Sequence, residues 1–256
     1  SNLDKQATFN HLLAEHELGR EEQGKVDAFT HKGAFVHMLF KLQDCPTYSK
    51  QLNRLNDIPG AHFGGAMVLP PEELQAAYET CQRGELPERM PLAFQLPTVM
   101  DPTLAPPGYH IATAYGFYFP CDADKSARGK LRDQAAENII EHISQYLPNF
   151  RELIVDQAIF SGDHFTSMHG VTNGDWTHGL LHPDQMIGER CLVDGTGHTT
   201  PVGNLFLCGA SCHPGPGVTF LPGYNCAHEM MATAVVKDSV TGETTSAAPA
   251  PAVHAA

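Results

Sequence analysis

The sequence has no long apolar run, little positive charge and a single tryptophan. No uninterrupted apolar stretch approaches the roughly 20 residues that a membrane-spanning helix needs, and the opening SNLDKQATFN is too polar for a secretory signal peptide. The 16 basic side chains stand against 29 acidic ones, which gives a formal net charge of −13. This balance argues against nucleic acid and anionic membranes as partners. We therefore expect a cytoplasmic protein with no membrane span and no nucleic-acid partner.

Several motifs with well-defined chemistry are also missing. Neither H-E-x-x-H nor C-x-x-C occurs, so the 15 histidines give little reason to expect a metal site. No serine lies in a G-x-S-x-G setting, which disfavours a hydrolase. Cys208 and Cys212 are one residue too far apart for haem attachment, and they make a weak redox pair. Without a secretory signal, the seven cysteines are expected to be reduced thiols.

Apolar periodicity predicts a body in which strands and helices alternate. Strands are expected over 33–44, on both sides of the proline-rich turn 101–108, over 151–160 and over 204–210. Helices are expected over 70–87, 125–150 and 223–238, and residues 161–200 are expected to be mostly loop. The predicted fold class is α/β (mixed α+β).

Three portions of the chain are expected. Residues 1–160 would form a substrate-binding portion, and residues 161–236 a C-terminal segment that faces a ligand. The tail 237–256 has too little apolar bulk to pack, so we predict that it is disordered.

The segment 204–229 is unusually rich in small and rigid residues. It reads NLFLCGASCHPGPGVTFLPGYNCAHE, with four glycines and three prolines between an apolar stretch and a predicted helix. Glycine lets a ligand approach the backbone because no Cβ stands in the way, and proline holds a loop in a fixed shape. The N-terminus of the following helix suits a phosphate or an electron-rich ring. The pattern favours a ligand-facing turn, although a tight structural connection would use the same residue types.

Three segments together carry a family resemblance. They are TPVGNLFLCGASCHPGPGVTFLPGYNCAHE at 200–229, MDPTLAPPGYH at 100–110 and GDWTHGLLHPDQMIGER at 174–190. The first resembles the C-terminal flavin-contacting segment of phytoene-desaturase-like FAD-dependent oxidoreductases, the group that includes pyridine nucleotide-disulfide oxidoreductase domain 2-like proteins. The other two are similar to a segment of that family's substrate-side domain and to the segment that precedes the flavin motif. The resemblance covers roughly residues 33–236. It implies in addition that the sheet with its helices is a substrate domain and that the C-terminal strand and helix belong to a cofactor-binding domain.

The resemblance implies which residues would face the cofactor, FAD. These cofactor-binding residues would be Gly209, Ala210, His213, Pro214, Gly215, Gly217, Val218, Gly223 and Asn225. His178 and His213 are the candidate catalytic side chains, and each could equally be a hydrogen-bonded loop histidine. Arg190 is expected to pair with a carboxylate, most simply in a structural ion pair. No metal ligand is expected.

One motif of that family does not occur in the sequence. The family's N-terminal dinucleotide-binding unit carries G-x-G-x-x-G, which is absent from this chain. The resemblance therefore implies the C-terminal portion of an FAD-dependent oxidoreductase, inactive alone and binding FAD weakly or not at all without an N-terminal FAD-binding half or partner chain. The completed enzyme would oxidise an apolar or amine-type small molecule by hydride transfer to flavin. The alternative is a non-catalytic binding or assembly module, and a homo-oligomer is compatible with either.

Overall fold

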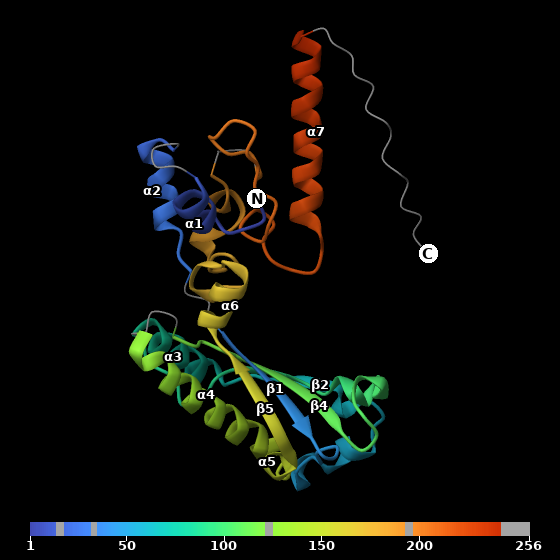
Figure 1. Ribbon diagram of the computed structural model, residues 1–256. Coiled ribbons are helices and arrows are strands. Elements are labelled where there is room, and N and C mark those ends of the chain that lie inside the picture. The colour runs from blue at the N-terminus through green and yellow to red at the C-terminus, as the bar shows by residue number, and fades with distance from the viewer. Residues whose placement is uncertain (14–17, 32–34, 121–124, 193–196, 242–256) are drawn as a thin grey trace.

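The computed structural model describes residues 1–13, 18–31, 35–120, 125–192 and 197–241. Two parts are evident in it (Figure 1), which we call the sheet body (residues 35–160) and the loop region (residues 1–31 and 161–241). The helices are α1 (Lys5–Ala7), α2 (Arg20–Ala28), α3 (Pro71–Gln82), α4 (Lys125–Tyr146), α5 (Phe150–Leu153), α6 (Gly162–His169) and α7 (Leu221–Thr241), and the strands are β1 (Phe35–Leu42), β2 (Gly64–Met67), β3 (Leu92–Gln95), β4 (His110–Phe117) and β5 (Ile154–Phe160).

The sheet body is built on one antiparallel sheet with the strand order β2-β3-β4-β1-β5. Along β1, alternate residues are buried, and these face α4, which covers one side of the sheet (Figure 1). Gly116 of β4 lies under α4, where an added Cβ would come within 2.9 Å of Ile139 Cδ1. The residues that are buried at every second position of β1 thus pack against the residues that recur every 3.6 positions along α4, and together they form one apolar core. The predicted mixed fold class is confirmed.

Helix α3 shows why the sequence signals worked in the sheet body. Pro71 occupies its first position, where a missing N–H costs nothing, and Glu72 and Glu73 lie in its first turn. Gly84 follows its end with φ +79°, a conformation that glycine adopts readily.

The loop region differs from the prediction in two elements. The strand expected over 204–210 is reduced to a single antiparallel bridge between Thr199 and Phe206, because no neighbouring strand of the described chain extends the ladder. Residues 161–200, expected to be mostly loop, contain α6, where Ser161 and His164 form a capping box. Histidine stands there in place of the usual glutamate, so the signal was not visible in the sequence.

The N-terminal segment (residues 1–31) contacts residues 161–241 rather than the sheet body, although it precedes the sheet in the sequence. The Asp4 carboxylate accepts hydrogen bonds from the Thr172 N–H and hydroxyl, each at 2.8 Å, and Lys5 Nζ donates to the Ser211 carbonyl at 2.6 Å. The substrate-binding portion was expected to span 1–160, so these contacts join its beginning to the other portion.

Helix α7 projects from the loop region and stands apart from the other labelled helices (Figure 1). It continues through Thr241, so residues 237–241 of the predicted tail are helical, and the rest of that tail lies outside the described residues. Within the described ranges, no helix combines the length and apolar character needed to cross a membrane.

Candidate functional site

The first half of the glycine-rich loop is packed against other backbone. An added Cβ at Gly209 would stand 2.2 Å from the carbonyl oxygen of Asn2, so only glycine fits there. Ser211 and Cys212 are buried, and the Ala210 carbonyl accepts hydrogen bonds from Arg190. The N-terminal segment therefore accounts for the glycine at 209.

The second half of the loop is open. Gly215 and Gly217 have φ values of +103° and +141°, which other residues rarely adopt. An added Cβ at Gly217 would meet only the Thr219 side chain, at 3.6 Å. Val218 and Phe220 are 97% and 82% exposed. Free backbone and apolar side chains thus face outward together.

The remaining predicted cofactor residues lie on either side of this open stretch. His213 and Pro214, joined by a cis peptide bond, are exposed. Gly223 has no atom within 4 Å of an added Cβ, and Asn225 is half-buried, both within the first turns of α7. His213, Pro214 and Gly223 are therefore exposed on either side of Gly217, whereas Asn225 is half-buried.

Arg190 holds the packed half of the loop in place. Its buried guanidinium donates to four backbone carbonyls, those of Thr177, Gly179, Gln185 and Ala210, at 2.7–3.3 Å. A Cβ at Gly215 would stand 3.7 Å from Arg190 Nε. The expected carboxylate partner is wrong, because carbonyl oxygens of three separate segments converge on this one side chain.

A buried cluster of charged groups lies beside Arg190. Asp4 and Asp175 are fully buried, and Asp175 accepts from the N–H groups of Thr177 and Gly179 at 2.9 and 3.0 Å. Burial raises the pKa of Asp4, but hydrogen bonds from Ala7 and Thr172 and the neighbouring His31 outweigh burial and leave that pKa below its ordinary value.

Lys5 is the buried cation of this cluster. Its Nζ lies 3.8 Å above the Phe29 ring centroid, and burial lowers the pKa of its ammonium to about 8. No sequence pattern indicated Lys5, Asp4 or Asp175, because their importance depends on burial that only the fold creates.

The two candidate histidines occupy different environments. His178 is half-buried with φ +52°, and its Nδ1 is a buried nitrogen without a hydrogen-bond partner among the described residues. Burial lowers the pKa of His178, so its imidazole is neutral near pH 7. Within the described ranges no hydrogen bond or ring contact joins His178 to His213. Arg190 lies close enough to His178 for its charge to add to the effect of burial on the pKa of that imidazole, whereas His213 is exposed and lies next to Gly197.

The side of the sheet opposite α4 carries a row of rings. His37 of β1 stacks on Tyr115 of β4 with centroids 4.2 Å apart and planes 4° apart, and its Nε2 lies 2.6 Å from the Thr113 hydroxyl. Trp176, the single tryptophan, stacks on Tyr115 and contacts Phe35. The rings lead from the sheet towards the segment that carries His178.

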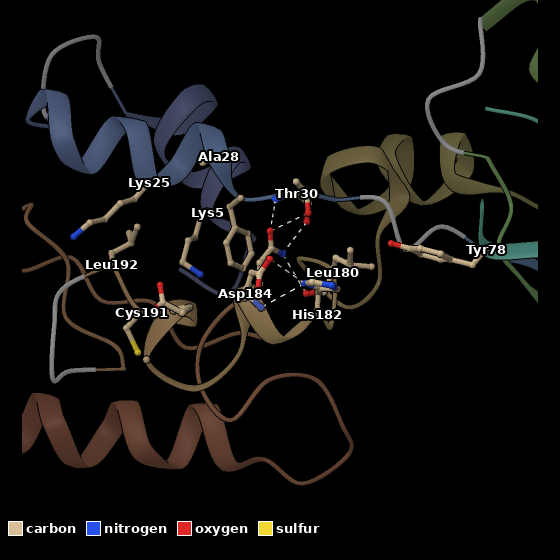
Figure 2. Close-up of a pocket in the computed structure, with 14 residues that line it drawn as sticks. Lys5, Lys25, Ala28, Thr30, Tyr78, Leu180, His182, Asp184, Cys191 and Leu192 are labelled. Atoms are coloured by element: carbon tan, nitrogen blue, oxygen red, sulfur yellow. Dashed lines mark hydrogen bonds and ion pairs between the residues drawn. The ribbon is translucent and has the colours of Figure 1, made fainter. Parts of the chain in front are cut away.

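A cleft of about 650 Å³ opens between α2 and the segment 180–192. Lys25, Cys191 and Leu192 lie towards one end and Tyr78 towards the other (Figure 2). Gln185 lines it and is fixed by Thr30, whose N–H and hydroxyl both donate to Gln185 Oε1 at 2.7 and 2.9 Å. No residue of the glycine-rich loop is among those that line the cleft. The described residues contain no group of three or more His, Cys, Asp or Glu side chains placed to hold a metal ion.

Comparison with known proteins gives consistent relatives at modest identity. The chain is 29% identical over 191 residues to pyridine nucleotide-disulfide oxidoreductase domain-containing protein 2 of Rattus norvegicus, covering 72% of this chain and 32% of that protein. It is 23% identical over 242 residues to a lycopene-forming phytoene desaturase of Pseudescherichia vulneris, covering 93% and 44%. The chloroplastic prolycopene isomerase 1 of an Oncidium hybrid cultivar is 26% identical over 212 residues, covering 76% and 34%. The aligned part is thus about a third of the first relative's length, and no family model matches.

Proposed function

We propose that this chain, which is similar to phytoene-desaturase-like FAD-type oxidoreductases, forms the substrate-binding and flavin-facing portion of such an enzyme. The completed enzyme would oxidise an apolar or amine-type substrate by hydride transfer to flavin. A dinucleotide-binding half, on the same or another polypeptide, would supply the contacts to the nucleotide end of FAD, and the chain described here would be inactive without it.

The observation that carries this proposal is the open half of the glycine-rich loop. At Gly217 and Gly223 the space that a Cβ would occupy is nearly empty, and Val218, Phe220 and Tyr224 expose apolar surface around it. A flat apolar ring fits backbone that lacks side chains, and exposed apolar groups gain free energy when something covers them. The residues from Gly217 to Asn225 therefore fit a flavin ring better than the packed residues 209–212 and the buried Gly215 do.

The chain's own groups have distinct roles in this proposal. Bound flavin would supply the hydride acceptor. At the start of α7 the first N–H is bonded to the Thr219 hydroxyl and Pro222 has no N–H, so the Gly223 N–H and the positive end of the helix dipole would favour negative charge next to the loop. Arg190 positions the loop through the Ala210 carbonyl, and the unpartnered Nδ1 of neutral His178 offers a hydrogen bond to a substrate or cofactor atom.

The proposed substrate surface is the ring-bearing side of the sheet. His37, Tyr115 and Trp176 stack there, and Leu39 is 37% exposed. A half-exposed apolar surface that leads towards the loop region suits an apolar molecule held next to the flavin. Burial lowers the pKa of His37, which keeps its ring neutral and compatible with such a ligand.

The proposal is tested by titrating FAD with increasing concentrations of the chain and recording flavin fluorescence. We expect weak quenching that appears only at high protein concentration. Gly217→Val should abolish it, because a branched side chain would fill the opening at a backbone conformation that it cannot adopt. Gly203→Val is the matched control, since Gly203 has neither a positive φ nor a close neighbour.

Two results would decide against this function. Tight binding of FAD, with a coloured purified protein, would show that no further half is needed. Quenching that is absent, or equal in the wild-type chain and the Gly217→Val variant, would favour the alternative of a non-catalytic binding or assembly module.

A further inference from the structure

Two cysteines from distant turns meet at the base of α7. The Thr199 hydroxyl donates a hydrogen bond to the Glu229 carboxylate, and Thr199 also forms the bridge with Phe206. Cys226 precedes Glu229 by three residues and so shares its helix face. Cys208 follows Phe206 by two residues and so shares its side of an extended chain. These two attachments direct the Cys208 side chain towards the face of α7 that carries Cys226, and Cys208 is a neighbouring group that, after burial, raises the pKa of the Cys226 thiol.

The two thiols differ in access. Cys208 is half-buried, and its Sγ lies 3.4 Å from the Ser1 carbonyl oxygen, which accepts its hydrogen bond. Cys226 is 3% exposed, and burial together with neighbouring Cys208 raises the pKa of its thiol. Both are free thiols in the structure. An oxidant from solvent therefore reaches Cys208 first, with Cys226 next to it as a second thiol.

We propose that Cys208 and Cys226 form a reversible disulfide that closes the glycine-rich loop into a covalent ring. Both the packed half and the open half of the glycine-rich loop lie between the two cysteines in the sequence. The ring would enclose all of the predicted cofactor-binding residues, Gly209, Ala210, His213, Pro214, Gly215, Gly217, Val218, Gly223 and Asn225. In the oxidised chain the disulfide would prevent the start of the loop from moving away from the start of α7, and in the reduced chain this restraint would be absent.

The chemistry balances with a hydroperoxide as the oxidant. The Cys208 sulfur attacks the O–O bond of hydrogen peroxide, which forms a sulfenic acid and releases one water. The Cys226 sulfur then attacks the Cys208 sulfur, so that the S–S bond forms, the S–O bond breaks and a second water leaves with the Cys226 proton. Two thiols are oxidised and one peroxide is reduced. A dithiol such as dithiothreitol reverses the result.

Peptide mapping of the wild-type chain tests the proposal directly. After treatment with hydrogen peroxide, the intact chain should lose the mass of two hydrogen atoms and regain it with dithiothreitol. Chymotrypsin cleaves after aromatic residues and leucine, so it separates the segment that begins at Cys208 from the segment that begins at Asn225. We expect these two peptides to be linked before reduction. Amide exchange between residues 209 and 225 should slow by roughly tenfold in the oxidised chain.

Cys212 is the competing thiol, because it lies on the same peptide as Cys208 and is 1% exposed. Cys212→Ser should keep the link, whereas Cys208→Ser should remove it. A link that Cys212→Ser abolishes, a link to Cys191, or peroxide treatment that leaves all thiols free or over-oxidised would each overturn the proposal. The wild-type peptide map decides the question even if a variant fails to fold. No flavin is needed, so the outcome is independent of the proposed function.

Discussion

The sheet body and the loop region are stabilised in different ways. The sheet body has a large apolar core in which α4 packs on one side of the sheet, with Ile139 and Met38 fully buried. The loop region has only a small apolar cluster and instead buries charged groups such as Lys5, Asp175 and Arg190. It also leaves Val218 and Phe220 exposed. One part packs most of its apolar residues in a large core of its own, whereas the other is organised by polar contacts; both leave some apolar side chains exposed, such as Leu39 and Val68 in the sheet body.

This difference has a functional consequence. Burial of apolar area is non-directional, so it produces a stable platform without fixing any particular backbone group. Hydrogen bonds to a buried guanidinium fix individual carbonyls, and a partly satisfied network is costly. The loop region therefore fixes its backbone groups in positions that suit a ligand. This arrangement depends on a few buried polar residues, so replacing one of them should disrupt it.

Replacing Arg190 should give the largest effect and should break the loop region selectively. Arg190→Met removes the arginine's hydrogen bonds to the carbonyls of Thr177, Gly179, Gln185 and Ala210, of which only that of Gly179 keeps a bond from a described residue, the Thr177 hydroxyl. We expect a loss of about 3–5 kcal/mol in the free energy of unfolding. Urea unfolding followed by Trp176 fluorescence measures it, and amide exchange should show lost protection around Ala210 while β1 stays protected.

Arg151→Met is the matched control for this variant. Its side chain is 47% exposed and pairs with Glu137 on the surface of α4, so its loss should cost about 0.5 kcal/mol or less. Equal effects of the two substitutions, or equal loss of protection in β1 and at Ala210, would contradict the contrast between the two parts.

The reverse experiment targets the sheet body. Ile139→Ala leaves a cavity under α4 and should cost about 3 kcal/mol, with lost protection first in β1 and β4. Gly116→Ala should destabilise the wild-type chain because its Cβ would come within 2.9 Å of Ile139 Cδ1. In the Ile139→Ala background that clash disappears and only the approach to Val36 Cγ2 at 3.1 Å remains, so the same glycine substitution should cost markedly less. Additive effects in this double-mutant cycle would show that the two residues do not share the packing described here.

The two parts also differ in how far the sequence predicted them. Strand alternation and helix signals identified β1, β4, β5, α3 and α4, because a local pattern decides which side of each element is buried. The strand expected over 204–210 did not form because, within the described chain, its apolar run makes the Thr199–Phe206 bridge and isolated backbone hydrogen bonds with His198 and Ser1, which do not extend into a ladder. An apolar run indicates burial, but a strand also needs a partner that local sequence does not reveal.

The sequence predicted which residues form the candidate site, but it did not predict how those residues pack. The glycine and proline spacing indicated a ligand-facing loop, yet the sequence could not show that Gly209 accommodates Asn2 while Gly217 stays open. Nor could it show that Arg190 binds carbonyls, since an arginine's partners depend on chain segments distant in sequence. Lys5 and Asp4 were missed for the same reason.

The buried ammonium of Lys5 predicts a specific pH dependence of the loop region. Its pKa of about 8 in the folded chain lies below its ordinary value of 10.5, so the unfolded chain binds more protons between those two pH values. Stability therefore rises with pH across that window, by roughly 3 kcal/mol from this group. Cys212 acts in the opposite sense, because burial raises the pKa of its thiol from 9.0 to about 11.

Comparison of variants isolates the contribution of Lys5. Urea unfolding of the wild-type chain and of Lys5→Met should be measured between pH 8 and pH 10.5, and the difference between their stabilities should grow with pH in favour of the wild-type chain. Lys25→Met removes a half-exposed lysine near the same cleft and should show no such trend. A constant difference between wild type and Lys5→Met would mean that the ammonium is not buried as described.

Val218 should give the smallest effect on stability, and that small effect is informative. Its side chain is 97% exposed, so Val218→Ser removes almost no buried area and should change the free energy of unfolding by less than about 0.5 kcal/mol. The same substitution should weaken the quenching of FAD fluorescence, because it removes apolar surface from the rim of the open loop. A residue whose replacement leaves stability unchanged but weakens ligand binding belongs to a binding surface and not to the structural core. Destabilisation as large as that of Ile139→Ala would instead place Val218 inside a core, and the loop region would then resemble the sheet body.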